Sequence, residues 1–358
     1  MKVSQIVLAA VAASVAHGFM PTVPKSSTVR CETSSSSLHA IGPLVRKAKE
    51  ATLKKYISEG IEDIVMDKYK IIQAALEKDD IDLTQSSDVV GPLQTELHKR
   101  KGTITVIAEY KRRLADSSFV NERFVPELLS PEFRESGASG IAVMADERMG
   151  GCTYVDVKGF VEEQRQAKSK VPGPVTVINN DLIIDELQVA QTAAYGASAV
   201  VLSLQLLGGD ETQKLMKASR AVDLEVIVTV SSHEEAQKAV DLGARMLMVV
   251  NVPGVEEKVK VIENLNVPEG QKMTMIANIL HSDNTGFEEI EEAWGCRDKG
   301  FSCAWVSDVL YKAGSDLNER PGAVIKNIKA KSSLKWATPK ATSGRGEGAR
   351  EYLGDIMM

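Results

Sequence analysis

The chain has 358 residues, of which 43% are hydrophobic and 26% charged, with a formal net charge of −6. This composition is that of an ordinary globular protein and excludes fibrous, collagen-like and wholly disordered chains. The charge is uneven, because residues 1–39 carry +2 and residues 326–358 carry +4, which leaves −12 on the residues between them; so acidic a body is not expected to bind nucleic acid.

The first 38 residues predict a removable targeting segment. After Lys2, an apolar run from Val3 to Ala16 is too short to span a bilayer and is typical of a secretory signal peptide. Residues 19–38 are rich in Ser and Thr and hold one acid, as transit peptides do. With Phe-Met-Pro at 19–21, the two parts resemble the presequence of algae whose plastids lie inside extra membranes. We therefore expect delivery to the plastid stroma and a mature chain without a membrane span; simple secretion is the alternative.

Cysteine and histidine spacing bears on the compartment and on metal chemistry. Beyond Cys31 the cysteines are Cys152, Cys296 and Cys303, with no C-x-x-C pair, whereas a secreted protein of this size more often carries an even framework of disulfides. Three scattered thiols suit a reducing stroma. No two of the five histidines are spaced as ligands on one helix or loop, and we expect neither a metal site nor a cofactor.

The body divides into a helical extension at 41–102 and a region of alternating strands and helices at 103–325. From Pro43 to about Asp79, apolar residues recur every three or four positions, which predicts two amphipathic helices. Eight β-rich runs then alternate with helix-length segments. These runs are 103–109, 140–144, 175–179, 199–202, 225–230, 246–250, 273–277 and 303–306.

Strands that alternate with single helices predict parallel pairing through right-handed crossovers. A glycine precedes each even-numbered strand in a similar phrase, where it would end a helix in the left-handed conformation. These glycines are Gly137, Gly196, Gly243 and Gly300. The repeat is a quarter barrel, so we predict a (β/α)8 TIM barrel. A doubly wound open sheet is the alternative, disfavoured because no G-x-G-x-x-G follows the first strand.

In such barrels the chemistry lies where the strands end. The segment after the first strand has a carboxylate, Glu109, and three cations, Lys111, Arg112 and Arg113, which makes it a candidate anion site. His233 falls in a capping box at 232–235 and is expected on the surface. Three acids at other strand ends are either catalytic or fix loop geometry: Asp146, Glu147 and Asp181.

These strand ends resemble the indole-3-glycerol phosphate synthase family of tryptophan biosynthesis. Residues 106–112, Val-Ile-Ala-Glu-Tyr-Lys-Arg, resemble its first strand, and 181–185 followed by Gln188 resemble its third-strand segment. Residues 146–148 with Gly151 are similar to its second loop. The resemblance covers about 41–330 and implies a TIM barrel with an amino-terminal helical extension. It also implies a lyase that closes an indole ring with loss of carbon dioxide and water.

Carried over residue by residue, the resemblance implies that Glu109 and Lys111 are retained catalytic positions. The family's general-acid lysine after strand 3 is replaced by Asn180, and its general-base glutamate in strand 5 by Thr229. Glu225, at the amino end of strand 5, is about 13 Å from the active face by strand geometry and cannot substitute. The family's phosphate-binding Glu-Ser-Gly and Gly-Ser read Asn278-Ile279-Leu280 and Ser307-Asp308. The substituted substrate-binding positions are Arg113, Asn180, Asn278 and Ser307.

We therefore predict a catalytically impaired or non-catalytic barrel that acts as a binding or assembly protein. One alternative is an active synthase, and another is a site for a different anion at Lys111, Arg112, Arg113 and Arg148. Residues 326–358 predict a flexible basic tail with an apolar end, which is either a docking segment for a protein partner or a frayed terminus.

Overall fold

The computed structural model describes residues 35–83, 91–98, 103–280, 287–312 and 321–330. The predicted presequence up to residue 34 and the tail from residue 331 lie outside these ranges. The chain divides into a unit of residues 1–43, of which only helical backbone from Ser35 is described, and a unit of residues 44–358. The account below concerns the second unit.

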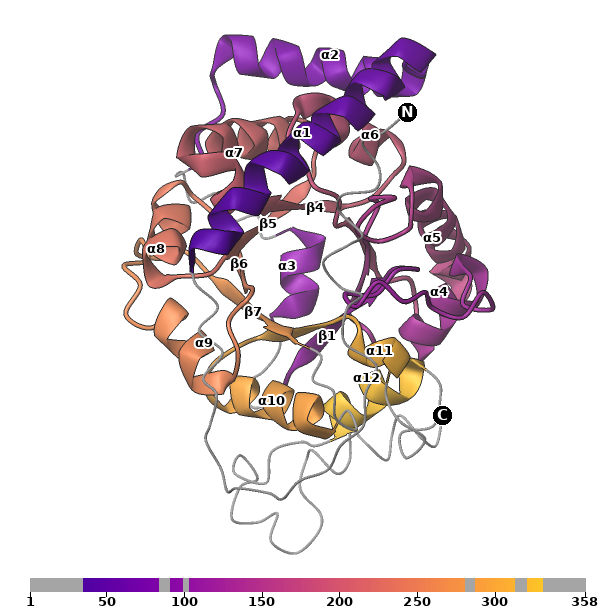
Figure 1. The fold of residues 1–358 in the computed structure, drawn as a ribbon, viewed down its shortest axis with the longest axis vertical. Helices are drawn as coiled ribbons and strands as arrows, with labels where there is room; N and C mark the ends of the chain where they lie inside the picture. The colour runs from indigo at the N-terminus through magenta and orange to yellow at the C-terminus, as the bar shows by residue number, and fades with distance from the viewer. Residues whose placement is uncertain (1–34, 84–90, 99–102, 281–286, 313–320, 331–358) are drawn as a thin grey trace, which may run out of the picture. The chain divides into compact units, whose positions relative to one another are not determined.

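Eight parallel strands form a closed barrel in sequence order, and β8 pairs with β1 (Figure 1). The TIM barrel prediction is confirmed, and each predicted run overlaps a strand to within one or two residues at its carboxyl end. The open-sheet alternative is wrong, because a closed barrel has no edge strand. The strands are β1 (Thr105–Tyr110), β2 (Gly140–Val143), β3 (Thr176–Asn179), β4 (Ala199–Ser203), β5 (Glu225–Val230), β6 (Met246–Val249), β7 (Thr274–Ile279) and β8 (Cys303–Val306).

Helices surround the ring of strands (Figure 1). They are α4 (Pro126–Glu135), α5 (Tyr154–Gln166), α6 (Glu186–Ala194), α7 (Leu204–Ala221), α8 (His233–Asp241), α9 (Val255–Ile262), α10 (Phe287–Asp298), α11 (Val309–Lys312) and α12 (Pro321–Ala330), with a 3-10 turn at Ala167–Ser169. The glycine before each even-numbered strand has φ between 85° and 103°, which confirms the predicted left-handed helix ends at Gly137, Gly196, Gly243 and Gly300.

Alternate strand residues point into the barrel and fill it. Trp305 of β8 is the largest of these side chains and is almost fully buried. The other strand side chains in this inner cluster are Ile107, Ala142, Ile178, Ala199, Val201, Ile227, Met246, Met248, Ile276 and Cys303. The centre of the barrel is therefore a packed core, and ligands have access only at its ends.

A short helix, α3 (Pro92–Leu97), closes the amino end of the barrel. Leu93 and Leu97 are 0% exposed and pack into the inner cluster. Glu225, the first residue of β5, accepts hydrogen bonds from the backbone N–H groups of Leu93 (2.6 Å) and Gln94 (2.9 Å). Its carboxylate thus caps the first turn of α3, where backbone N–H groups have no partner within the helix.

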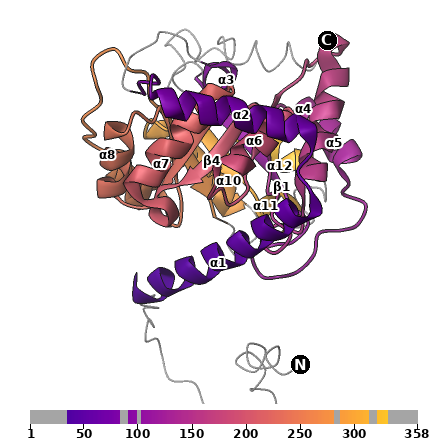
Figure 2. The same ribbon diagram turned by 90° about the horizontal axis from the view of Figure 1, so that it is seen from above.

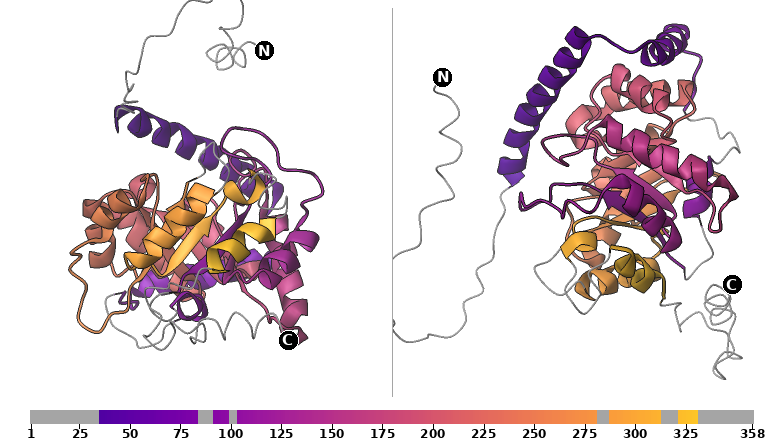
Figure 3. Two further views of the ribbon diagram at one scale, coloured as in Figure 1. Left: turned by 90° about the horizontal axis from the view of Figure 1, so that it is seen from below. Right: turned by 90° about the vertical axis from the view of Figure 1, so that its right-hand side faces the viewer.

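The two predicted helices before the barrel are confirmed as α1 (Ser35–Glu59) and α2 (Asp63–Lys78). α2 packs against α6 and α7 through the buried side chains of Val65 and Ile72. Residues 44–59 of α1 lie at the end of the barrel opposite α3 (Figure 2; Figure 3, right). Within this stretch the one buried side chain is that of Lys49.

The last helix extends into the range predicted as tail. Ile328 of α12 is 1% exposed, and its carbonyl oxygen accepts a hydrogen bond from Trp294 Nε1 at 2.9 Å. Lys329 Nζ donates to the carbonyl oxygen of Gly137 at 2.7 Å. Residues 326–330 therefore belong to the barrel wall. No helix in the described ranges is long and apolar enough to cross a membrane.

Candidate functional site

The mouth of the barrel, where the strands end, gathers the positions that the sequence singled out. Each of these positions lies two residues after a side chain of the inner core. Because side chains alternate between the two faces of a strand, the side chain at each position also points toward the barrel axis. Glu109 is buried, whereas the others are half-buried. The positions that converge here are Glu109, Asn180, Thr229, Asn278 and Ser307.

Glu109 is held by Asn180, which follows β3. Asn180 Nδ2 donates to Glu109 Oε1 at 2.6 Å, and Glu109 itself is buried. Tyr311 donates its hydroxyl to the Glu109 carbonyl oxygen at 2.9 Å. A side-chain amide orients a carboxylate but does not donate a proton as a general acid, so this pair is suited to structure and binding.

Lys111 forms an ion pair with Asp308, which follows β8. Both side chains are buried, with 10% of the Lys111 side chain and 7% of the Asp308 side chain exposed. The second carboxylate oxygen of Asp308 accepts the backbone N–H of Ala115 at 2.9 Å. The retained cation at the mouth is thus neutralised from within the protein.

The arginines beside Lys111 have other contacts. Arg112 donates to the Tyr110 hydroxyl at 3.0 Å and to Asp156 at 2.6 Å. Arg113 Nη1 donates to the carbonyl oxygen of Arg148 at 2.9 Å, and the side chain of Arg148 is exposed. These contacts lead toward α5 and the loop after β2 rather than to one common anion site with Lys111.

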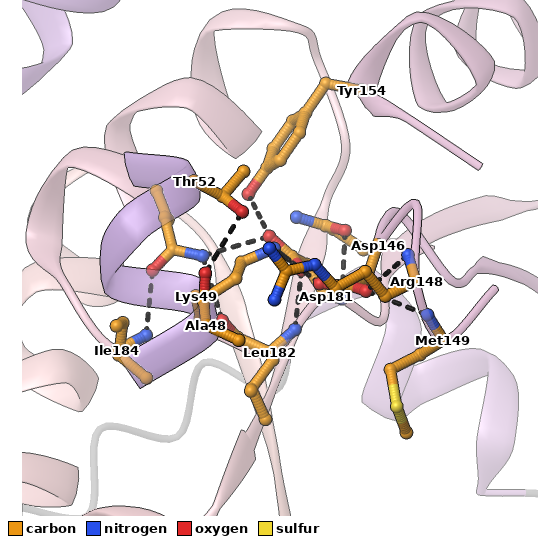
Figure 4. A network of polar contacts seen from close by, with 12 residues as sticks. Ala48, Lys49, Thr52, Asp146, Arg148, Met149, Tyr154, Asp181, Leu182 and Ile184 are labelled. Carbon is orange, nitrogen blue, oxygen red and sulfur yellow. Dashed lines mark hydrogen bonds and ion pairs between the residues drawn. The ribbon is translucent and has the colours of Figure 1, made fainter. Parts of the chain in front are cut away.

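A second charged cluster, which the sequence did not reveal, joins α1 to the mouth (Figure 4). Lys49 is 7% exposed and forms ion pairs with Asp146, at 3.0 Å, and with Asp181. Asp181 also accepts hydrogen bonds from the Tyr154 hydroxyl and from Gln188 Nε2, each at 2.9 Å. A lysine on the inward stripe of an amphipathic helix was the available signal, since Lys49 falls four residues before the half-buried Leu53.

The two acids of this cluster have their pKa values shifted in opposite directions. Burial raises the pKa of the Asp181 carboxyl, although Lys49 opposes the shift. Burial acts on Asp146 in the same direction, but Lys49 and the N–H groups of Met149 and Arg148 outweigh it, and the pKa of Asp146 is lowered. Every oxygen of these two carboxylates has a hydrogen-bond or ion-pair partner within the protein.

The remaining candidates lie away from the mouth or face solvent. Glu147 is exposed, and Glu225 caps α3 at the opposite end of the barrel. His233 is on the surface as predicted, and Ser232 accepts the Glu235 N–H at 3.2 Å. Ser232 thus caps α8 as predicted, but the Glu235 carboxylate accepts the N–H of Ser231 instead of that of Ser232, so the return bond of the box is offset by one residue.

Cysteines and potential metal ligands are arranged as follows in the described ranges. No group of three or more His, Cys, Asp and Glu side chains there is arranged to hold a metal ion. Cys152, Cys296 and Cys303 are buried free thiols, and burial raises the pKa of each to about 12. A thiol with so high a pKa is a poor nucleophile near neutral pH.

Comparison with known families matches residues 56–268 to the family described as indole-3-glycerol phosphate synthase. The chain belongs to this family. It is 29% identical over 145 residues to the indole-3-glycerol phosphate synthase of Leptospira interrogans, a match that covers 40% of this chain and 54% of that protein. It is 24% identical over 225 residues to the enzyme of Koribacter versatilis, covering 63% of this chain and 80% of the other. The first of these matches thus spans about half the length of the relative.

Among solved structures, thiamine phosphate pyrophosphorylase from Pyrococcus furiosus aligns with a TM-score of 0.43 and 17% identity, covering 64% of this chain and 97% of the other.

The predicted relation to the indole-3-glycerol phosphate synthase family is confirmed by the family match. The family match ends at residue 268, before β7 and β8. Asn278, Ser307 and Asp308 therefore lie beyond the matched stretch, in the part of the barrel where the family's phosphate site is expected.

Proposed function

We propose that this protein is a non-catalytic indole-3-glycerol phosphate synthase-family barrel that acts as a binding or assembly protein. The observation that carries the proposal is that both retained polar groups at the mouth are engaged by substituted residues. Asn180 holds Glu109, and Asp308 neutralises Lys111. A mouth whose polar groups satisfy one another has been adapted to remain folded without a reacting ligand.

The missing proton-transfer groups decide the expected rate. The amide of Asn180 and the hydroxyl of Thr229 do not exchange protons efficiently near neutral pH. A positioned general acid or base contributes about 10²- to 10⁴-fold in rate, so the loss of both lowers it by about 10⁴-fold or more. Asp308 adds a carboxylate where the phosphate dianion of the family's substrate would bind, which weakens orientation of the substrate as well.

The test is a ring-closure assay on purified protein that begins near residue 41. The carboxyphenylamino deoxyribulose phosphate substrate is supplied, and formation of indole-3-glycerol phosphate is followed by its fluorescence. We expect a rate lower by about 10⁴-fold than that of an active family member assayed alongside, and no rescue of a tryptophan auxotroph despite soluble expression. Ring closure at a useful rate that Lys111→Ala abolishes would overturn the proposal.

The second candidate function is an active synthase in tryptophan biosynthesis. It is favoured by the retention of Glu109 and Lys111 in β1 and the segment after it, within the matched stretch. This candidate predicts that the auxotroph grows. Growth that depends on Glu109 would establish it and exclude the non-catalytic proposal.

We also propose that residues 1–38 direct the protein to the plastid. The support is the apolar run followed by a stretch rich in Ser and Thr with a single acid. A fluorescent protein fused to residues 1–38 should enter the plastid of an alga with extra plastid membranes. A fusion to residues 1–18 should enter the secretory route alone. Secretion of both fusions would contradict plastid targeting.

Finally, we propose that the basic, apolar-ended segment after α12 binds a protein partner. The support is its charge and the apolar residues near its end, such as Tyr352, Leu353 and Ile356. A chain that ends at residue 330 keeps α12 whole and is the matched control. A partner should bind the full chain and the isolated segment fused to a carrier, but not the shortened chain. Equal binding by the full and the shortened chain would refute the role of the segment.

A further inference from the structure

The structure assigns to Asp308 the role of an internal ligand, whose carboxylate occupies a small oxyanion site formed by Lys111 Nζ and the backbone N–H of Ala115. In the wild-type protein this site is closed to anions in solution. The inference deepens the proposed function, on which it rests for the view that the mouth is not in catalytic use. Without the Asp308 carboxylate, an oxyanion from solution would bind at the mouth.

The contacts of Asp308 are those that a free anion makes. One carboxylate oxygen pairs with the Lys111 ammonium, and the other accepts the N–H of Ala115 at 2.9 Å. A cation together with a backbone N–H is the donor set that proteins use for carboxylate and phosphate ligands. The Ser307 hydroxyl also donates to this carboxylate, at 3.5 Å, and 93% of the Asp308 side chain is buried, so these donors have replaced most of its hydration.

The donors stay in place through contacts that do not involve the Asp308 carboxylate. Ala115 lies in a tight turn in which Leu114 N–H donates to the Ser118 carbonyl oxygen and Ser117 N–H to the Leu114 carbonyl oxygen, each at 2.9 Å. Lys111 directly follows β1, whose residues are all buried and pair with both β2 and β8. Removal of the carboxylate therefore leaves a site that is already organised to accept an anion.

Removal also leaves a buried charge without its partner. The Lys111 side chain is 90% buried, and a buried ammonium is unfavourable unless it is paired or hydrogen-bonded. An oxyanion from solution that enters the vacated space restores the pairing, and its binding then stabilises the folded state. Both substitutions needed for the test, Asp308→Ala and Lys111→Met, change residues at the mouth and leave the inner core intact.

The experiment compares inorganic phosphate binding by wild-type protein, Asp308→Ala and the double variant Lys111→Met/Asp308→Ala, at ionic strength held constant with sodium chloride. Calorimetric titration and thermal melting are both recorded. We expect Asp308→Ala to bind phosphate at least tenfold more tightly than wild type, with a melting temperature that rises with phosphate. The double variant has the space but not the charge, and we expect it to bind no better than wild type.

The inference is wrong if wild type binds phosphate as tightly as Asp308→Ala, or if the double variant does. Should Asp308→Ala aggregate, Asp308→Ser is measured in the same way, because its small hydroxyl leaves space for the anion; no gain over wild type in that variant also overturns the inference. Failure of the proposed function has a separate signature. Ring closure by wild type refutes the non-catalytic role, whereas absent phosphate binding by the variants refutes the internal ligand alone.

Discussion

Replacement of Lys49 by methionine tests whether the charged cluster holds α1 on the mouth of the barrel. Methionine keeps the length of the side chain but leaves Asp146 and Asp181 facing each other without a cation. The Asp181 side chain is 0% exposed and that of Asp146 is 13% exposed, so water cannot replace the lost partner while α1 stays docked. Removal of one partner from a buried ion pair destabilises by about 3–5 kcal/mol.

Because α1 can detach from the barrel, only part of this loss should appear in the free energy of unfolding of the whole protein. Of the other contacts of this helix, the Arg46–Glu211 ion pair is partly exposed, and such pairs contribute about 1 kcal/mol or less. The loss should therefore appear first as undocking of α1. In hydrogen exchange, about 3–5 kcal/mol corresponds to roughly 100- to 5,000-fold faster exchange of the amides at 44–59, with much smaller changes in β4 and β5.

The pH dependence has a definite sign. In wild type, the pKa of Asp146 is lowered, so its contribution is present above the ordinary Asp value of 3.8 and is lost as the pH falls through its folded pKa. In Lys49→Met both carboxyls lack the cation, so their pKa values rise and protonation relieves the repulsion. The difference in amide exchange at 44–59 between Lys49→Met and wild type should be largest near pH 7 and should become smaller as the solution is acidified.

Lys54→Met is the matched control, because Lys54 is an exposed lysine on the same helix. It should leave exchange at 44–59 within a few-fold of wild type. Exchange that is equally slow in Lys49→Met and wild type would refute the reasoning, as would equal acceleration in both variants. The first result would mean that α1 docks without the cluster, and the second that any change of charge on α1 loosens it.

Three further predictions concern the barrel body. Glu225→Gln offers one acceptor to two N–H groups of α3 and should lower the free energy of unfolding by about 1–3 kcal/mol in urea titrations. Because burial raises the pKa of Glu225 above 4.5, the stability advantage of wild type over this variant should shrink as the pH rises through that raised pKa. A stability advantage that grows over the same pH range would contradict this prediction. Trp305→Ala removes the largest side chain from the centre of the barrel and should lower the free energy of unfolding by about 3–5 kcal/mol in the same titration. A decrease below about 1 kcal/mol would mean that the core collapses into the space left by the indole ring. Iodoacetamide at pH 8 should leave Cys152, Cys296 and Cys303 unmodified in the native protein and modify them in urea, as mass spectrometry of peptides would show; rapid native labelling of any of them would contradict their burial.

Much of the fold was predictable because its signals are local. Each β-rich run overlaps a strand, and the four helix-ending glycines have the expected positive φ. The residues at the mouth followed from the same reasoning, since a fixed alternation places every second residue of a strand on one face. Glu109, Asn180, Thr229, Asn278 and Ser307 converge for that reason.

The pairings at the mouth were beyond the reach of local signals. Lys49 meets Asp181 across 132 positions of sequence, and Ala115 meets Asp308 across 193. Nothing in the spacing of such residues indicates that they touch, because contact depends on the position of α1 and on the closure of the barrel between β8 and β1. The resemblance placed an acid near the expected phosphate position, but it did not indicate that Lys111 would be its partner.

The cap on α3 has a consequence for the order in which the chain acquires structure. Leu93 and Gln94 are made well before Glu225, and 132 positions separate Leu93 from its acceptor. A chain that emerges from its amino end, whether from a ribosome or from a translocation pore, therefore exposes Leu93 and Leu97 until β5 has followed. In this interval the two leucines are free to make non-native contacts. Early fragments that end before residue 225 are thus the species that should depend most on chaperones.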